Sequence, residues 1–159
     1  MAKGNGIVVS YPERGVRFEG TITGALLPGT IVQIDVSEGI DTNGNFTWEA
    51  YNAAADGNQR LIAVLLPSEL KGAIATAAYV NGDHCFVYVP AAGEQLNCIV
   101  GDVAGTGDDH AFGDLLIVDD GTGELVATTG TPESEPFILL EAITDPTADT
   151  LAHVLFTGY

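Results

Sequence analysis

Residues 78–101 read AYVNGDHCFVYVPAAGEQLNCIVG and combine a turn signal, an alternating strand, a stop and a second apolar strand. The segment Asn81-Gly82-Asp83 contains residues that tolerate the positive φ angles of a tight turn. In residues 85–89, cysteine and valine alternate with Phe86 and Tyr88, until Pro90 removes a hydrogen-bond donor from the ladder. The stretch is therefore predicted to be a β-hairpin at the centre of an all-β domain.

On both sides of this stretch, short apolar runs are separated by turns rich in Gly, Asn and Asp. Asn43-Gly44 is the strongest short hairpin signal in the chain. No segment sustains an apolar period of 3.6 residues over about 12 positions, and strand centres recur every ~10 to 15 residues. The remaining strands are expected at residues 16–19, 31–36, 46–50, 61–66, 115–118, 125–128, 137–142 and 151–157.

The predicted fold is a compact all-β barrel or sandwich built from hairpins, with an extended N-terminal arm and little helix. Residues 1–15 would form the arm, residues 16–72 a first β lobe and residues 73–159 the main β domain. The alternative is one continuous domain over residues 16–159. The unbroken apolar run at residues 61–66 suits a strand buried on both faces.

The charge of the chain is strongly negative and unevenly distributed. Its formal net charge is -17, with only five Lys and Arg, and residues 72–159 contain none. Such a surface repels nucleic acid and anionic lipid, so we expect neither as a partner. The acidity also suits a surface that only keeps the protein in solution, without a specific electrostatic role.

Two features concern the compartment in which the protein is made. The N-terminal sequence lacks the apolar segment and cleavage site of a signal peptide, which indicates synthesis in a cytoplasm. Cys85 and Cys98 are the only cysteines, and on adjacent strands they could approach each other. We expect two buried thiols rather than a disulfide, because a cytoplasm is reducing.

Two stretches resemble calcium-binding loops. Residues 105–114 resemble a single copy of a calcium-binding nonapeptide repeat, but such repeats bind calcium only when copies are stacked. Residues 41–45 resemble the start of an EF-hand loop. The required glycine is replaced by Phe46 and the bidentate glutamate by Asn52, so a hairpin turn explains the stretch better.

No residue pattern points to catalysis. The three histidines, His84, His110 and His153, lie in separate segments, and no serine lies in a nucleophile elbow. Neighbouring carboxylates lie in predicted turns, where water solvates them. We therefore expect a protein that is not an enzyme and that uses no cofactor or metal.

The order of features in residues 73–159 carries a family resemblance. The features are Ala78-Tyr79 with Gly82-Asp83, Val87-Tyr88-Val89-Pro90, the segment AAGEQLN at 91–97, Gly101, Gly113-Asp114-Leu115-Leu116, DGTGELV at 120–126, the apolar run at 138–142 and the strand at 151–159. In the first half, Gly24 and residues 27–32 fit the same pattern, whereas residues 37–72 do not. In this order the chain resembles the capsid cement, or head decoration, proteins of tailed bacteriophages.

The resemblance implies a structural virion protein that binds the outer surface of an icosahedral phage head and cements neighbouring capsomers. Its partners would be the major capsid protein and itself, as a homotrimer, on a virion assembled in the host cytoplasm. A free-standing module that binds calcium or carbohydrate is the alternative.

The residues expected to make these contacts fall in two groups. Three of the five basic residues lie in or beside the arm, so Lys3, Arg14 and Arg17 are the candidate contacts to the capsid. One face of the predicted hairpin supplies the candidate subunit contacts, His84, Phe86 and Tyr88. The rest of that hairpin would be core.

Overall fold

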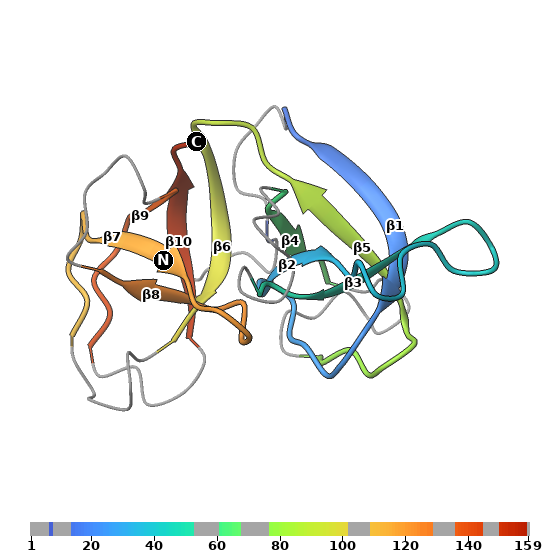
Figure 1. The fold of residues 1–159 in the computed structure, drawn as a ribbon. Coiled ribbons are helices and arrows are strands. Elements are labelled where there is room, and N and C mark those ends of the chain that lie inside the picture. The colour runs from blue at the N-terminus through green and yellow to red at the C-terminus, as the bar shows by residue number, and fades with distance from the viewer. Residues whose placement is uncertain are drawn as a thin grey trace.

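The computed structural model describes residues 7, 14–52, 61–67, 77–101, 109–128, 136–144 and 150–158 of the chain. All regular secondary structure in these residues is β-strand (Figure 1). The strands are β1 (Val16–Ile22), β2 (Ile31–Ile34), β3 (Phe46–Ala50), β4 (Ala63–Leu65), β5 (His84–Val89), β6 (Glu94–Val100), β7 (Leu115–Val118), β8 (Leu125–Ala127), β9 (Phe137–Leu139) and β10 (Thr150–Phe156). The predicted all-β class is confirmed, and of the two predicted architectures the barrel is observed. None of the described segments forms a helix long and apolar enough to cross a membrane.

The ten strands form two closed five-stranded barrels that lie side by side (Figure 1). The first has the strand order β1-β3-β2-β4-β5, and β5 closes it by pairing with β1. The second has the order β6-β8-β7-β9-β10, and β10 closes it by pairing with β6. In both barrels the first strand is parallel to the third, and all other pairs are antiparallel. The same topology therefore occurs twice in one chain.

The predicted hairpin at residues 78–101 is wrong in its pairing, although both of its strands are present. Strand β5 pairs with β1 and β4, whereas β6 pairs with β10 and β8. Pro90 ends β5, and Gly93, with a φ of 83°, turns the chain into β6 in the other barrel. The change of barrel therefore falls at residues 90–93, whereas we expected the first lobe to end at residue 72.

Two other predicted hairpins are confirmed. Strands β2 and β3 pair antiparallel around Asn43-Gly44, and Gly44 has the positive φ, 88°, that this turn requires. Strands β7 and β8 pair antiparallel around the turn at residues 119–123. Local turn chemistry is therefore sufficient where the two strands are neighbours in one barrel.

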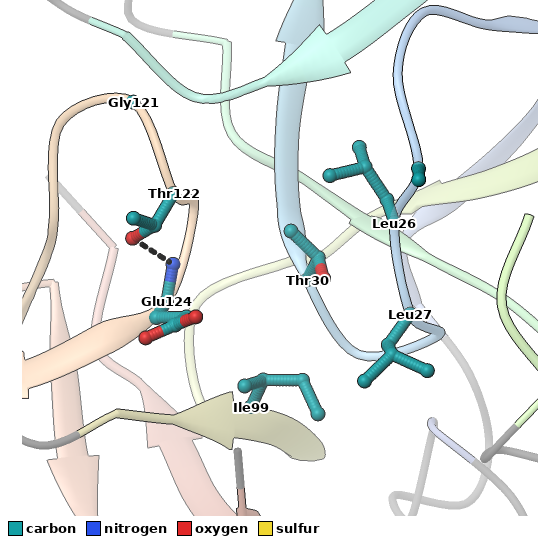
Figure 2. A pocket seen from close by; sticks show the side chains of 8 residues that line it. Leu26, Leu27, Thr30, Ile99, Gly121, Thr122 and Glu124 are labelled. Atoms are coloured by element: carbon teal, nitrogen blue, oxygen red, sulfur yellow. Dashed lines mark hydrogen bonds between the residues drawn. The ribbon is translucent and has the colours of Figure 1, made fainter. Parts of the chain in front are cut away.

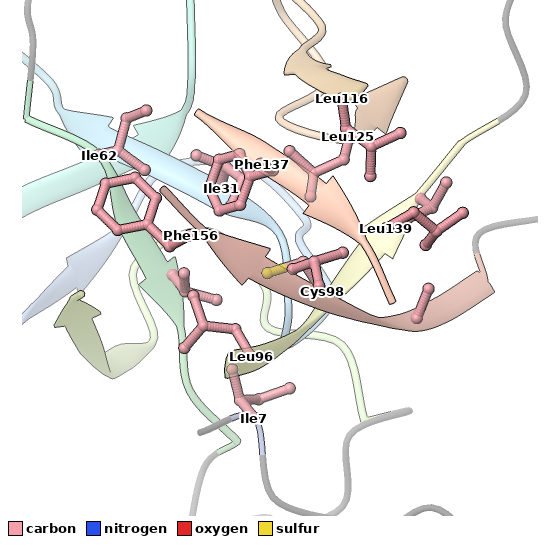
Figure 3. Close-up of a cluster of buried hydrophobic side chains, with 14 of the residues drawn as sticks. Ile7, Ile31, Ile62, Leu96, Cys98, Leu116, Leu125, Phe137, Leu139 and Phe156 are labelled. Atoms are coloured by element: carbon pink, nitrogen blue, oxygen red, sulfur yellow. The ribbon is translucent and has the colours of Figure 1, made fainter. Parts of the chain in front are cut away.

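Two hydrophobic clusters hold the barrels together. One fills the first barrel and includes Trp48, Ala63 and Leu65. The other fills the second barrel and continues onto the neighbouring face of the first, where Val64 belongs to it (Figure 3). Alternate residues of β4 thus enter different clusters, which confirms that this strand is buried on both faces.

The two cysteines lie in different barrels. Cys85 belongs to the cluster inside the first barrel and Cys98 to the cluster of the second. Both are buried and free, as expected. Burial raises the pKa of the Cys85 thiol to about 12, and it also raises the pKa of Cys98.

Main-chain hydrogen bonds connect the barrels directly. The N–H of Ile31 donates to the carbonyl of Gly123 at 2.8 Å, and the N–H of Ile99 donates to the carbonyl of Gly29 at 2.9 Å. A side chain at Gly123, whose φ is 70°, would collide with the carbonyl of Ile31. We call these bonds the main-chain seam, and its closeness requires glycine at this position.

Candidate functional site

The expected capsid contacts lie in different surroundings. Lys3 lies outside the described residues. The exposed Arg14 donates from its guanidinium to the carbonyl of Ala92 at 2.8 Å, so it is held against the link between the barrels. Arg17 is exposed on β1. Both arginines are therefore at the surface, and Arg14 also contributes to the fold of its own chain.

A buried carboxylate, Glu94, anchors the N-terminal segment between the barrels. One carboxylate oxygen accepts hydrogen bonds from the N–H of Arg14 at 2.6 Å and from the hydroxyl of Tyr88 at 2.7 Å. The other accepts from the N–H of Ala91 at 2.7 Å. Burial acts to raise the pKa of Glu94, but these donors outweigh it and hold the pKa below its usual value.

Tyr88 is not accessible as a subunit contact. Its ring is fully buried, and its hydroxyl accepts from the N–H of Gly15 at 2.7 Å while it donates to Glu94. The alternation of β5 was read correctly, but the face that holds Tyr88 turns toward the second barrel. That face could not be identified while β5 and β6 were expected to pair.

His84 and Phe86 remain at the surface of the first barrel. His84 is exposed and Phe86 is half-buried, and their rings make an edge-to-face contact with centroids 5.1 Å apart. Across the strand pair, they lie opposite Thr21 and Glu19 of β1. Phe86 also packs against the hydrophobic cluster that reaches the second barrel, so the accessible strip on this face of the β1–β5 pair consists of His84 and the exposed part of Phe86.

The stretch that resembles an EF-hand is a turn whose carboxylate binds its own backbone. Asp41 accepts hydrogen bonds from the N–H groups of Asn43 and Asn45, at 2.8 and 2.9 Å. The bond from the backbone of Asn45 is the largest contribution that lowers the pKa of Asp41. This carboxylate therefore stabilises the β2–β3 loop, which comprises residues 35–45 and extends beyond the first barrel in Figure 1.

Asp35 holds the other end of the β2–β3 loop. It accepts from the N–H and the hydroxyl of Ser37, at 2.9 and 2.6 Å, and from the N–H of Glu38 at 3.1 Å. Burial acts to raise the pKa of Asp35, but the hydrogen bonds, above all from the Ser37 hydroxyl, lower it overall. The loop thus has a defined shape fixed by two carboxylates.

The described residues bring no metal-binding group together: nowhere among them do three His, Cys, Asp or Glu side chains gather. His110 is buried, with its Nε2 3.4 Å from the carbonyl of Gly101, and Asp114 accepts from the N–H of Ala111. Residues 102–108 of the calcium-like stretch lie outside the described part of the chain. His153 lies on β10, far from His110 and Asp114 in sequence, and its strand partner is Asn97 of β6.

A shallow cavity of about 270 Å³ lies where the barrels meet (Figure 2). Leu27 and Thr30 line it from the first barrel, and Ile99 and Glu124 line it from the second. Glu124 is the single ionisable group in its lining, so the cavity offers no pair of groups for acid–base chemistry. It follows the junction of the barrels.

One apolar surface was missed by the sequence analysis. Inside the first barrel, Phe18, Phe46 and Trp48 form an aromatic cluster with ring centroids 6.1 to 6.3 Å apart. Val16, two residues before Phe18 on the same face of β1, is 55% exposed, and Ile40, which forms a bridge with Phe46, is 59% exposed. Phe18 and Phe46 themselves are half-buried. We call Val16, Phe18, Ile40 and Phe46 the barrel-mouth patch.

The only sequence signal for this patch is alternation. Val16 and Phe18 alternate with charged residues, which indicates a strand with one apolar face. Ile40 lies in a loop, and it reaches the patch through a single bridge to Phe46. No local pattern shows that this end of the barrel is left uncovered.

These features define a class: an all-β protein of two fused five-stranded barrels. No protein-family model and no curated protein sequence matches the chain. Among solved structures, the chain is similar to the N base of head fiber gp8.5 of bacteriophage phi29. The TM-score is 0.52 at 13% identity, and the match covers 91% of this chain and 95% of the other. The likeness shows a shared fold over nearly the whole of both chains.

Proposed function

We propose that this chain is a structural virion protein that binds the outer surface of an icosahedral phage head and cements neighbouring capsomers. The observation that carries the proposal is the extent of the match with the phage head fiber base, which includes both barrels. The order of sequence motifs supports the same class through its resemblance to phage cement proteins.

The two-barrel architecture suits a cementing role. A continuous hydrophobic cluster and the main-chain seam join the barrels, so surfaces on the two barrels keep a fixed separation. A protein that binds only the assembled lattice at more than one point stabilises that lattice by mass action. Such a role needs extended contact surfaces, which the strip at His84 and Phe86 and the barrel-mouth patch supply.

The charge distribution supports an orientation. The second barrel lies wholly within residues 72–159, which contain no Lys or Arg, so we propose that it faces solvent. Arg17, with Lys3, would contact the shell. His84 and Phe86 would form the contact between subunits of a homotrimer.

The test is co-sedimentation with assembled heads that were produced without this chain, followed by electron microscopy of the particles. We expect stoichiometric binding to heads and none to isolated capsid protein, with added density on the outer surface. Heads that bind nothing would contradict the proposal. A calcium-dependent rise in melting temperature without head binding would support the calcium-binding module instead.

The contact at the arm is best tested by Arg17→Glu. Deleting residues 1–15 would also remove Ile7, which is buried, and Arg14, which bonds to Glu94, and would therefore disturb the fold. We expect the charge reversal to weaken head binding, and circular dichroism of the same variant checks that the β fold is kept. Unchanged binding would remove Arg17 from the contact.

A further inference from the structure

In each barrel, the third strand pairs with only part of the first strand. Strand β1 pairs with β3 at Gly20–Ile22, and β6 pairs with β8 only at Val100. Toward its N-terminal end, each first strand therefore has one side without a third-strand neighbour. Backbone groups on such a side need another partner.

In the second barrel this side of β6 is covered. The N–H of Asn97 donates to the carbonyl of Ile7 at 2.6 Å, and the N–H of Ile99 donates to the carbonyl of Gly29. The side chain of Ile7 is buried in the cluster of the second barrel, beside Leu96 in Figure 3. Ile7 thus supplies both a backbone acceptor and an aliphatic side chain.

The equivalent position in the first barrel is Glu19. The N–H of Thr23 donates to the carbonyl of Trp48 in β3, and the N–H of Gly101 donates to the carbonyl of Leu125 in β8. Thr23 and Gly101 are therefore equivalent, and so are Glu19 and Asn97, which lie the same number of residues before them. The N–H of Ile22 bonds to Asp83, at the start of β5, so alternate residues of β1 direct their backbone groups toward β5. Glu19 therefore directs its N–H to the other side, where the described part of the chain places no strand.

The surface beside Glu19 is the barrel-mouth patch. Val16 and Phe18 lie on the same face of β1, and the ring of Phe18 is 6.3 Å from that of Phe46, which faces Ile40 across the bridge. Val16 and Ile40 are each more than half exposed. The side chain of Ile7 packs beside β6 in the second barrel, whereas at the equivalent place beside β1 the first barrel has exposed apolar side chains.

The charge around the patch selects the kind of segment that fits. Glu19 and Glu38 are exposed, residues 18–59 contain no Lys or Arg, and the exposed Arg17 is the strong base on β1 beside them. A second copy of this chain already uses its own Ile7 against β6, so that residue is not free to fill the patch. A segment of a different protein that carries Lys or Arg is complementary.

We propose that the open side of β1 at Glu19 binds an extended segment of another protein, which pairs with the β1 backbone. The segment places an aliphatic side chain on Val16, Phe18 and Ile40, next to a Lys or Arg of its own. We take the capsid shell as the source of that segment, and in this respect the inference rests on the proposed function. The binding mode is strand addition, and in the second barrel the hydrogen bond from Asn97 to Ile7 provides one such backbone contact within the chain.

The apolar part is tested with Ile40→Asp in the full chain, measured by binding to heads produced without it. The matched control is Val80→Asp, because Val80 is 56% exposed but lies at the turn before β5, away from the patch. We expect Ile40→Asp to weaken binding about tenfold or more, since burial of an aliphatic side chain is lost. Val80→Asp should bind within about twofold of the wild type.

The backbone part is tested with Glu19→Pro against Glu19→Ala. Proline removes the N–H that faces the open side but leaves the hydrogen bonds of neighbouring residues to β5. We expect Glu19→Pro to weaken head binding further than Glu19→Ala does, and circular dichroism should show the same β signal for both variants. A Glu19→Pro protein that fails to fold leaves the decision to Ile40→Asp.

The outcomes separate the inference from the function. If wild-type protein does not bind heads, the proposed function fails. If it binds and Ile40→Asp binds equally well, the inference alone is overturned. A change in sedimentation coefficient of the free protein on Ile40→Asp would show that a second copy occupies the patch, which would also overturn it.

Discussion

The two barrels have one topology but differ in what covers them. In the second barrel, the carbonyl groups of Ile7 and Gly29 accept hydrogen bonds from the side of β6 that β8 leaves unpaired, whereas no described segment pairs with the equivalent side of β1 at Glu19. The first barrel also holds the only tryptophan, and all five Lys and Arg lie within residues 1–71. Strand order therefore determines the shape of each barrel, while the segments laid over it determine which surface is left for a partner.

The largest effect is expected from a core truncation in the second barrel. Phe137 is fully buried and packs on Phe156 with ring centroids 5.2 Å apart. Phe137→Ala should lower the free energy of unfolding by about 3–5 kcal/mol. Because Trp48 is the only tryptophan and lies in the first barrel, its fluorescence in a urea titration reports whether the first barrel unfolds together with the second.

We expect the midpoints from Trp48 fluorescence and from circular dichroism to move down together, because one cluster spans both barrels. A Trp48 midpoint that stays in place would show two independent barrels. Phe112→Ala is the matched control, since Phe112 belongs to the second half of the chain but is 70% exposed. It should change stability by no more than about 0.5 kcal/mol.

A smaller effect is expected where the barrels touch. Gly123→Ala should cost about 2–3 kcal/mol, because its positive φ disfavours a side chain and the added methyl group would collide with the carbonyl of Ile31. Gly121 also has a positive φ, 93°, but nothing lies within 4 Å of an added Cβ, so Gly121→Ala should cost only about 1 kcal/mol. The difference between the two variants in urea titrations measures the contact at the main-chain seam. Equal losses would mean that the seam adjusts without cost.

The smallest effect is expected at the buried carboxylate beside the link. Glu94→Gln replaces one acceptor oxygen by an amide NH₂ that faces donors, and it should cost about 1–2 kcal/mol at pH 7. The pKa of Glu94 is lowered below its ordinary 4.5, so its ionised form is favoured in the folded state. Its contribution is complete above pH 4.5 and is lost as the pH falls through the folded-state pKa.

The stability difference between wild type and Glu94→Gln should therefore be constant from about pH 5 to 7 and should shrink at lower pH. Urea titrations at several pH values check this. Asp35 and Asp41, whose pKa values are also lowered, are present in both proteins and cancel in the comparison. A difference that grew on acidification would contradict the assigned hydrogen bonds.

The sequence predicted most strands, because alternation and turn residues act locally. Residues 46–50 and 115–118 were located to the residue, and Asn43-Gly44 correctly joined two paired strands. The pairing of β5 was mispredicted, since its partners β1 and β4 lie far from it in sequence. A turn after a strand shows where the chain bends but not which strand it meets next.

The exposure of the candidate contact residues was likewise predicted only where it follows from the local strand, and not where a distant segment determines it. His84 and Phe86 are at the surface, as their strand position allowed, but the burial of Tyr88 depends on the second barrel beside it. The backbone N–H of Arg14 is bound by Glu94, and its guanidinium by the carbonyl of Ala92, both far along the chain. The barrel-mouth patch depends on the length of the β1–β3 pairing, and no residue pattern states that length.

The main-chain seam has a consequence for how such proteins diverge. Its bonds join backbone atoms of Ile31, Gly123, Ile99 and Gly29, so other apolar side chains could replace the two buried isoleucines without altering those bonds. Mutations can then accumulate over most of the junction while the barrels keep their arrangement, and sequence similarity fades long before the architecture does. Gly123 and Gly29 are the seam positions where drift is restricted, because both have a positive φ and an added side chain would collide with the other barrel.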